Sequence, residues 1–257
     1  MSAVLAPVRT RSDVLSGRTA VVLHAHPDDE AIFTAVTMRR LADRGARVVL
    51  VTATAGELGP VLRPLRKGET LATRRRDELE AAAATLGVAR LVLLGHRDSG
   101  MAGWDDNAHP DALAAAPVER LATRLAELCH RENAEALVHY DPDGIYGHPD
   151  HLAVHRAGAA AARLARITAY EATVAADRPR TRRPHLVDAA AGARIGRDDV
   201  STVVVADPAE LRAKRRAMAA HGSQIPAAAT RRVGFTAAYG TEWFRRVGDP
   251  GLLDGLL

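Results

Sequence analysis

The sequence contains a single cysteine, Cys129. One cysteine cannot build a disulfide framework or a zinc cluster of thiolates, and a reducing, cytoplasmic setting is therefore expected. Long apolar runs are also missing, so no segment is expected to span a bilayer. Arg9, Arg11 and Asp13 interrupt the N-terminus before the apolar core of a signal peptide could form. We therefore expect no membrane partner.

Lysine and aromatic residues are scarce as well. Only Lys67 and Lys214 are lysines among 35 basic residues, so nearly all of the positive charge is arginine. The arginines are scattered among 31 acidic residues, and three Phe and two Trp leave little for base stacking. A nucleic-acid partner is therefore not expected. The one dense cluster, Arg178–Arg183, is interpreted as a loop that helps to recognise an anionic or polyhydroxylated ligand.

Apolar runs and amphipathic segments alternate along the chain. We expect strands at 19–24, 48–52, 91–94, 136–140 and 202–205, with another ending at 170–173, and helices at 30–44, 70–86, 113–131, 149–164 and 208–221. Strands that alternate with helices at this spacing imply crossover units, and hence an α/β fold with a parallel sheet.

The same pattern predicts how the chain is organised. Residues 1–18 are expected to form an N-terminal arm and residues 19–175 a catalytic core. The alternation weakens after about 175 and is ambiguous from about 225. We expect residues 176–257 to be a C-terminal extension that packs on the same domain.

Two strand ends carry polar sequences that sheet stability does not require. The first strand runs into His26-Pro27-Asp28-Asp29-Glu30, and the fourth is followed by His148-Pro149-Asp150-His151. Ligands bind at the carboxyl ends of strands in open α/β sheets. His26, Asp29 and His151 would supply two imidazoles and a carboxylate, the usual composition of a catalytic zinc site that keeps a position for water. The alternative is that these are ordinary loop histidines and that Asp28 or Asp29 caps the next helix. That alternative would have to explain why a His-Pro-Asp sequence follows two different strands.

At these residues the sequence resembles the PIG-L/LmbE-like zinc N-deacetylases. The similarity is greatest to the actinobacterial mycothiol subgroup, over Asp98–Gly103 and Tyr140–His151. That subgroup comprises the N-acetylglucosaminyl-inositol deacetylase and the thiol-conjugate amidase. The resemblance implies a Rossmann-like, mostly parallel sheet with helices on both faces, and hydrolysis of N-acetyl groups.

Carried over position by position, the resemblance makes His26, Asp29 and His151 the metal ligands. The metal would be Zn²⁺, with Fe²⁺ possible in the cell. Asp28 would be the general base. The chemistry agrees with this division, because one of two adjacent carboxylates can hold the metal while the other takes a proton from the attacking water.

Three further residues match catalytic positions of the family. His148, as an imidazolium, would stabilise the developing oxyanion. Asp150 would orient His148 or tune its pKa. Tyr146 matches a mobile tyrosine near the substrate carbonyl, with an ordinary half-buried loop tyrosine as the alternative. The leaving amine would take its proton from either Asp28 or His148.

Two residues match substrate-binding positions. Arg75 resembles a sugar-binding arginine, although Arg74 and Arg76 flank it and a solvated helix face would explain all three. Asp98 would accept hydrogen bonds from sugar hydroxyls, with a turn-forming aspartate as the alternative. Glu57 is expected to support the site from the second strand end.

The expected function is zinc-dependent hydrolysis of an N-acetyl amide on an amino-sugar conjugate or similar small metabolite, which yields a free amine and acetate. One alternative is a thiol-conjugate amidase with the same metal chemistry, and another is a non-catalytic binding homologue. A homo-oligomer is compatible with the sequence. The bulky Ile32 and Phe33 and the short segment between Gly59 and Arg75 depart from the subgroup, and they leave the substrate open.

Overall fold

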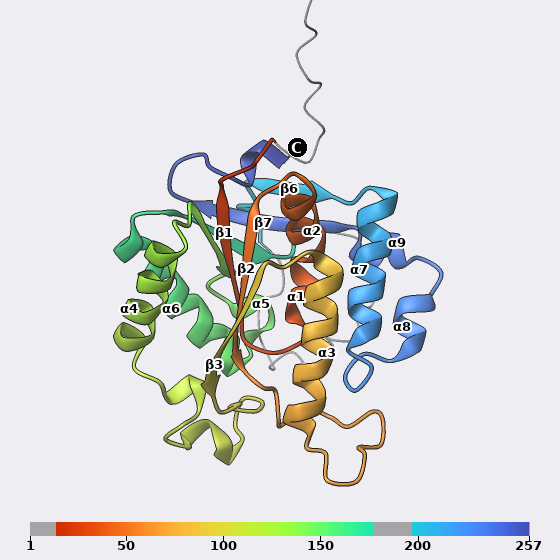
Figure 1. Cartoon of the computed structure of the whole chain (residues 1–257). Helices are drawn as coiled ribbons and strands as arrows, with labels where there is room; N and C mark the ends of the chain where they lie inside the picture. The colour runs from red at the N-terminus through yellow and green to blue at the C-terminus, as the bar shows by residue number, and fades with distance from the viewer. Residues whose placement is uncertain (1–13, 177–196, 257) are drawn as a thin grey trace, which may run out of the picture.

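A seven-stranded sheet forms the centre of the computed structural model, which describes residues 14–176 and 197–256 (Figure 1). Its order is β3-β2-β1-β4-β5-β7-β6. The strands are β1 (Thr19–His24), β2 (Arg47–Thr54), β3 (Arg90–His96), β4 (Ala136–Tyr140), β5 (Thr168–Thr173), β6 (Thr202–Val205) and β7 (Thr241–Val247). β1 to β5 pair in parallel, and β7 runs antiparallel to β5 and β6. The expected mostly parallel α/β sheet is confirmed.

Helices cover both faces of this sheet (Figure 1). They are α1 (Asp29–Phe33), α2 (Ala35–Asp43), α3 (Leu71–Leu86), α4 (Val118–Arg131), α5 (Gly144–Gly147), α6 (Pro149–Ala165), α7 (Pro208–Ala220), α8 (Ala227–Arg231) and α9 (Phe235–Tyr239). α4 packs against α6 on one face, and α3 and α2 pack against α7 on the other. The whole of β1 is buried between these two layers, as a central strand of a parallel sheet should be.

The prediction of a single helix at 30–44 is wrong, because Thr34 interrupts the helix and separates α1 from α2. The Glu242 carboxylate, which comes from β7, accepts hydrogen bonds from the backbone N–H groups of Val36 and Thr37, each at 2.9 Å. A cap supplied by a residue two hundred positions away leaves no local signal. Lys214 Nζ, 2.7 Å from Glu242, neutralises the buried carboxylate.

The helix expected at 113–131 is also divided. A short 3-10 turn spans Leu113–Ala115, and α4 begins only after Pro117, which occupies the N-cap. The region that the sequence left ambiguous contains α8, α9 and β7, and β7 inserts between β5 and β6. Arg178–Arg183 and most of the expected N-terminal arm lie outside the described residues.

The strand order places the two polar sequences side by side. From β1 the chain moves outward to β2 and β3, whereas β4 pairs with the other side of β1. The order therefore reverses between β1 and β4, and such a switch point opens a crevice at the carboxyl ends of the two strands. The loop after β1 carries His26 to Asp29, and the loop after β4 leads to His148 to His151.

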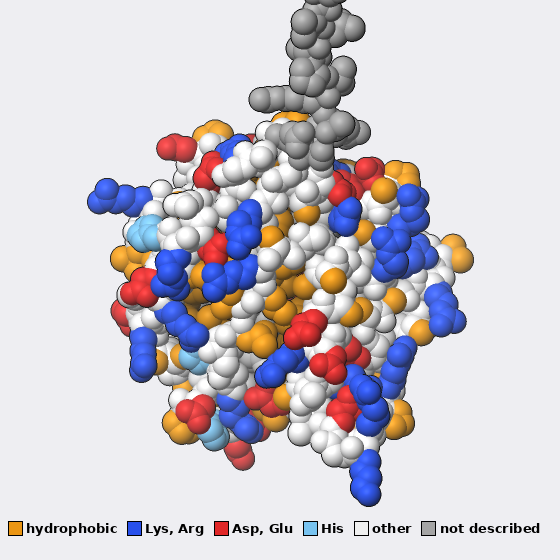
Figure 2. All heavy atoms as spheres, in the orientation of Figure 1, with side chains coloured by type: hydrophobic (Ala, Val, Ile, Leu, Met, Phe, Trp, Pro, Cys, Tyr) orange, Lys and Arg blue, Asp and Glu red, His pale blue; other side chains and the backbone are white. Residues whose placement is uncertain are grey.

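One edge strand of the sheet is β3, in which Leu91, Val92 and Leu93 are only half-buried. Figure 2 shows hydrophobic side chains gathered in the middle of this face, with arginine and lysine side chains around them. Among the described residues, no helix combines the length and the apolar character needed to cross a bilayer.

Candidate functional site

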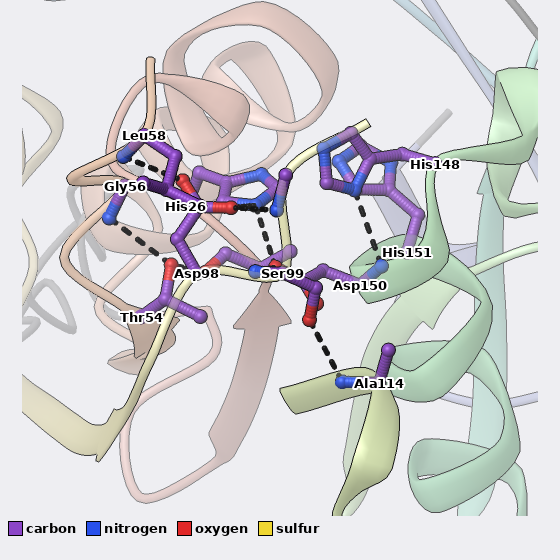
Figure 3. Close-up of polar contacts among 12 residues, drawn as sticks. His26, Thr54, Gly56, Leu58, Asp98, Ser99, Ala114, His148, Asp150 and His151 are labelled. Carbon is purple, nitrogen blue, oxygen red and sulfur yellow. Dashed lines mark hydrogen bonds and ion pairs between the residues drawn. The ribbon is translucent and has the colours of Figure 1, made fainter. Parts of the chain in front are cut away.

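His26, Asp29 and His151 meet at the switch point. Asp29 Oδ2 lies 3.4 Å from His26 Nδ1 and 3.4 Å from His151 Nε2. All three residues are buried, and one possible ligand atom from each lies within 4.8 Å of the others. The structure thus brings together the three residues that the sequence nominated as metal ligands (Figure 3 shows the two histidines).

Hydrogen bonds orient both imidazoles toward the shared carboxylate. His26 Nε2 lies 3.1 Å from the Asp150 carboxylate, and His151 Nδ1 lies 3.2 Å from the carbonyl oxygen of Gly144. If each of these nitrogens carries the proton, His26 Nδ1 and His151 Nε2 keep lone pairs that face Asp29. His151 Nε2 is buried, and the described residues offer it no hydrogen-bond partner. Imidazoles that ligate metals are held in this way by a carboxylate or a carbonyl, so the donor set fits a divalent cation.

The electrostatics of the cluster favour a cation too. Burial raises the pKa of Asp29, but His151 and His26 outweigh that effect and hold it well below its ordinary value. Burial lowers the pKa of His26, but hydrogen bonds with Asp150 and Asp29 outweigh it and raise this pKa well above the ordinary value. A buried anionic carboxylate therefore attracts positive charge here, which a metal ion can supply in place of a proton.

A second set of close residues, His26, Asp98 and His148, fits a metal less well. The Asp98 oxygens already accept backbone N–H groups from Gly100 at 2.8 Å and Leu58 at 3.2 Å. His26 Nε2 faces Asp150, as described above. His148 Nδ1 accepts the backbone N–H of Asp150 at 3.1 Å.

Asp28 lies at the edge of the cluster in an unusual backbone conformation, with φ 114°. A non-glycine residue adopts such an angle only when its surroundings enforce it. The Glu30 carboxylate accepts the Asp28 backbone N–H at 2.9 Å, and Arg75 Nη2 lies 3.3 Å from Asp28 Oδ1. Burial raises the pKa of Asp28 to about 6, although Arg75 opposes the shift. This carboxylate is suited to exchange protons near neutral pH.

His148 occupies the N-cap of α6, where its Nδ1 accepts the Asp150 backbone N–H. Burial, together with the nearby His26, lowers the pKa of His148 to about 2. Because Nδ1 accepts a backbone N–H and burial lowers the pKa, the structure favours a neutral ring with its proton on Nε2 over the expected imidazolium. His148 and His26 lie edge to face, with ring centroids 4.6 Å apart.

Asp150 contacts His148, the residue that it was expected to orient, and it also contacts His26. Its carboxylate bonds to His26 Nε2 and to the hydroxyl and backbone N–H of Ser99, and only its backbone N–H contacts His148 (Figure 3). The Asp150 charge also acts on His148, where it raises the pKa against the larger effects of burial and His26. Asp150 therefore orients His26 with its carboxylate and His148 with its backbone.

Tyr146 stands beside the cluster, its ring 4.8 Å from the His151 ring and 6.2 Å from the His148 ring. Burial, then the charges of Asp29 and Asp28, raise the pKa of its hydroxyl, which therefore stays protonated. The preceding residue, Ile145, has φ 63°, a strained value for a β-branched side chain. This turn presents Tyr146 to the site.

Among the three adjacent arginines, the structure singles out Arg75. Its guanidinium is buried and donates to the carbonyl oxygens of Gly56 at 2.7 Å and Pro27 at 2.5 Å. Arg74 instead pairs with Glu69 at 2.5 Å, and Arg76 is exposed. Arg75 therefore ties the loops after β1 and β2 together beside Asp28.

Asp98 is buried next to His26, with 3.7 Å between Asp98 Oδ1 and His26 Nε2 (Figure 3). The Glu57 carboxylate accepts the backbone N–H of Asp98 at 3.0 Å. Glu57 thus supports the site from the end of β2, as expected.

The sequence analysis assigned no role to Tyr140, Ser99 or His221, yet all three support the cluster. The Tyr140 hydroxyl donates to Asp29 Oδ2 at 2.7 Å, and its ring stacks on His151 with centroids 4.1 Å apart. Ser99 holds the Asp150 carboxylate. His221 Nε2 lies 2.6 Å from the Glu30 carboxylate. The signal for Tyr140 and Ser99 was that both lie in the segments of greatest similarity to the mycothiol subgroup, Tyr140–His151 and Asp98–Gly103.

These side chains open into a cavity of about 710 Å³, a volume typical of small-molecule sites. Its polar part includes His26, Asp28, Asp29, Arg75, Asp98, Tyr146, His148 and Gln224. The rest of the lining is largely apolar, and residues 218–239 form one wall.

The comparisons with known proteins agree with this site. The family model PIG-L, described as GlcNAc-PI de-N-acetylase, matches residues 21–162, which include both polar sequences. The chain is 43% identical over 159 residues to the 1D-myo-inositol 2-acetamido-2-deoxy-alpha-D-glucopyranoside deacetylase of Streptomyces scabiei, covering 58% of this chain and 49% of that relative. The chain spans about half the length of the curated relatives it matches.

Solved structures share the fold at low sequence identity. The A40926 pseudoaglycone deacetylase superimposes with a TM-score of 0.63 at 18% identity, over 93% of this chain and 98% of that one. The zinc-inhibited form of teicoplanin deacetylase gives 0.61 at 18% identity, over 89% and 98%. The family match covers more than half of the chain and contains the whole candidate metal cluster, and the chain therefore belongs to the PIG-L family.

Proposed function

We propose that this protein is a zinc-dependent N-deacetylase that hydrolyses the N-acetyl amide of an amino-sugar conjugate or a similar small metabolite. The observation that carries the proposal is the buried group of His26, Asp29 and His151, whose ring nitrogens face one carboxylate oxygen, with Asp28 beside it. The family match and the names of the curated relatives support the reaction.

In this proposal His26 Nδ1, Asp29 and His151 Nε2 hold the metal. Zinc bound there would supply Lewis acidity, because it lowers the pKa of water and polarises an amide carbonyl. Asp150, Tyr140 and the Gly144 carbonyl keep the three ligands oriented.

Asp28 takes the proton of the attacking water. With a pKa of about 6 its carboxylate is mostly ionised at neutral pH and yet is basic enough to accept a proton. The same carboxyl group then protonates the leaving amine. His148 does not compete for that step, because its Nδ1 is occupied by the Asp150 backbone N–H and its ring is neutral.

His148 instead donates its Nε2–H to the oxygen of the attacked carbonyl as negative charge develops there. Tyr146, with a protonated hydroxyl next to His148, is a second donor for the same oxygen. Asp98 and Arg75 line the cavity beyond the cluster, where they contact the sugar hydroxyls.

Metal analysis and an amine-release screen test the proposal together. Protein purified without chelator should carry about one zinc per chain, and it should release amine from N-acetylglucosamine or its inositol conjugate. Hydrolysis confined to thiol conjugates would instead assign the amidase activity. A protein that binds no metal even on addition would contradict the mechanism.

A further inference from the structure

The mouth of the cavity is apolar on one side, next to Asp98. The loops after β2 and β3 line it with Leu58, Pro60, Leu62, Met101 and Trp104. Trp104 is 48% exposed and Leu62 is 47% exposed. Large exposed hydrophobic side chains that converge on one opening mark a surface that binds an apolar group.

A chain of contacts leads outward from the metal cluster to this rim. Asp98 Oδ1 lies 3.7 Å from His26 Nε2 and accepts the backbone N–H of Gly100 at 2.8 Å. The indole of Trp104 covers Gly100, where a Cβ atom would lie only 2.4 Å from Trp104 Cε3. A ligand that reaches from the cluster past Asp98 therefore meets the Trp104 ring next.

Both rim loops are held in place by hydrogen bonds. Asn107 Nδ2 donates to the carbonyl oxygens of Ser99 at 2.5 Å and Met101 at 3.1 Å, which fixes the Trp104 loop. The backbone N–H of Leu62 donates to the carbonyl oxygen of Ser223 at 3.0 Å, and Gln224 Nε2 donates to the carbonyl oxygen of Pro60 at 2.7 Å. These hydrogen bonds pre-organise the apolar rim, which lowers the cost of binding.

The rim suits some substrates better than others. The five rim side chains offer one hydrogen-bonding N–H, that of the Trp104 indole, and the neighbouring Gln224 amide already donates to the Pro60 carbonyl oxygen. A polyhydroxylated aglycone such as inositol would lose water from several hydroxyls there and gain only the Trp104 indole and the Gln224 amide as partners, which is costly. An alkyl or aryl aglycone would instead bury its surface against Leu62 and Trp104.

We propose that this deacetylase acts on an amino sugar whose aglycone is apolar, and that Trp104 and Leu62 select that aglycone. The inference rests on the proposed function for the position of the amide. The sugar binds at Asp98 with its acetamido group at the candidate metal site. The aglycone of the bound substrate extends out of the cavity and contacts the rim.

The test compares methyl, n-hexyl, phenyl and myo-inositol glycosides of N-acetylglucosamine with the zinc-loaded protein. Calorimetry with the matching glucosaminides, which cannot be turned over, measures binding separately from hydrolysis. We expect kcat/KM and affinity to be about tenfold higher for the hexyl and phenyl glycosides than for the methyl and inositol glycosides. The Trp104→Ala and Leu62→Ser variants should lower the hexyl-to-methyl ratio toward one. Val205→Ser, which changes an exposed apolar side chain on β6, should leave it intact.

Equal affinities for all four glycosides, or a preference for inositol, would overturn the proposal, as would a hexyl preference that survives in both rim variants. No binding of any glycoside would overturn it as well. A hexyl preference in binding that depends on Trp104, without hydrolysis of any glycoside, would support the rim as the aglycone site and refute the proposed deacetylation.

Discussion

His221 Nε2 lies 2.6 Å from Glu30 Oε1, and both side chains are completely buried. Burial lowers the pKa of His221, but the Glu30 charge outweighs it and the pKa is raised, so the two form an ion pair. The other Glu30 oxygen accepts the backbone N–H of Asp28 at 2.9 Å. A residue beyond the family match thus holds the loop that carries the candidate base.

Removing either partner of this pair should destabilise the fold strongly. Glu30→Ala and His221→Ala should each lower the free energy of unfolding by about 3–5 kcal/mol, because the remaining charge stays buried without a partner. The double variant should lose clearly less than the sum of the two. Urea titrations of the three variants measure this, and strict additivity would show that the pair is not coupled.

Asp150 should govern metal affinity, because its carboxylate orients His26. Asp150→Asn is expected to weaken zinc binding about 10- to 100-fold, as substitutions behind metal-ligating histidines do. Competition with a chromophoric chelator measures the affinity. Asp43→Asn, which alters a surface ion pair with Arg39, is the matched control and should bind zinc like the unaltered protein. Unchanged affinity in Asp150→Asn would assign the orientation of His26 to other contacts.

His139 should make stability depend on pH. It is fully buried on β4, and burial, with His155 nearby, lowers its pKa from 6.5 to about 3. Below pH 6.5 the unfolded chain therefore binds a proton at this position that the folded chain does not. The free energy of unfolding consequently decreases as the pH is lowered. The loss from this residue should reach about 2 kcal/mol at pH 5 relative to pH 7.5.

The His139→Gln variant tests this assignment. Its free energy of unfolding should change less between pH 7.5 and pH 5 than that of the unaltered protein, whereas the exposed His130→Gln should retain the full dependence. An identical pH dependence in all three proteins would remove His139 from the explanation.

The sequence predicted the part of the fold that depends on local pattern. The apolar runs of β1 and β4 and the helix that ends at Gly87 were found within a residue or two. The break at Thr34 and the insertion of β7 were not predicted, because both depend on Glu242 and its strand reaching residues that are distant in sequence.

In the candidate site, too, the sequence predicted what local pattern determines and missed what depends on contacts between distant residues. His26, Asp29 and His151 could be nominated because metal-binding residue types stand directly after apolar runs. The lowered pKa of His148 could not be foreseen, since it depends on burial of the ring and on His26, which is distant in sequence. Tyr140 could not be selected either, because a tyrosine that ends a buried strand is ordinary until the strand order places it against Asp29.

Hydrolysis by a metal-loaded Asp28→Ala variant shows most directly whether Asp28 moves the protons. The protein should retain about one zinc per chain, because Asp28 is not among the three ligands, and kcat for amine release should fall at least about 100-fold. Asp77→Ala, which removes an exposed carboxylate from α3, should keep full activity. Undiminished turnover by zinc-loaded Asp28→Ala would contradict the central claim that Asp28 moves the protons of amide hydrolysis at this site.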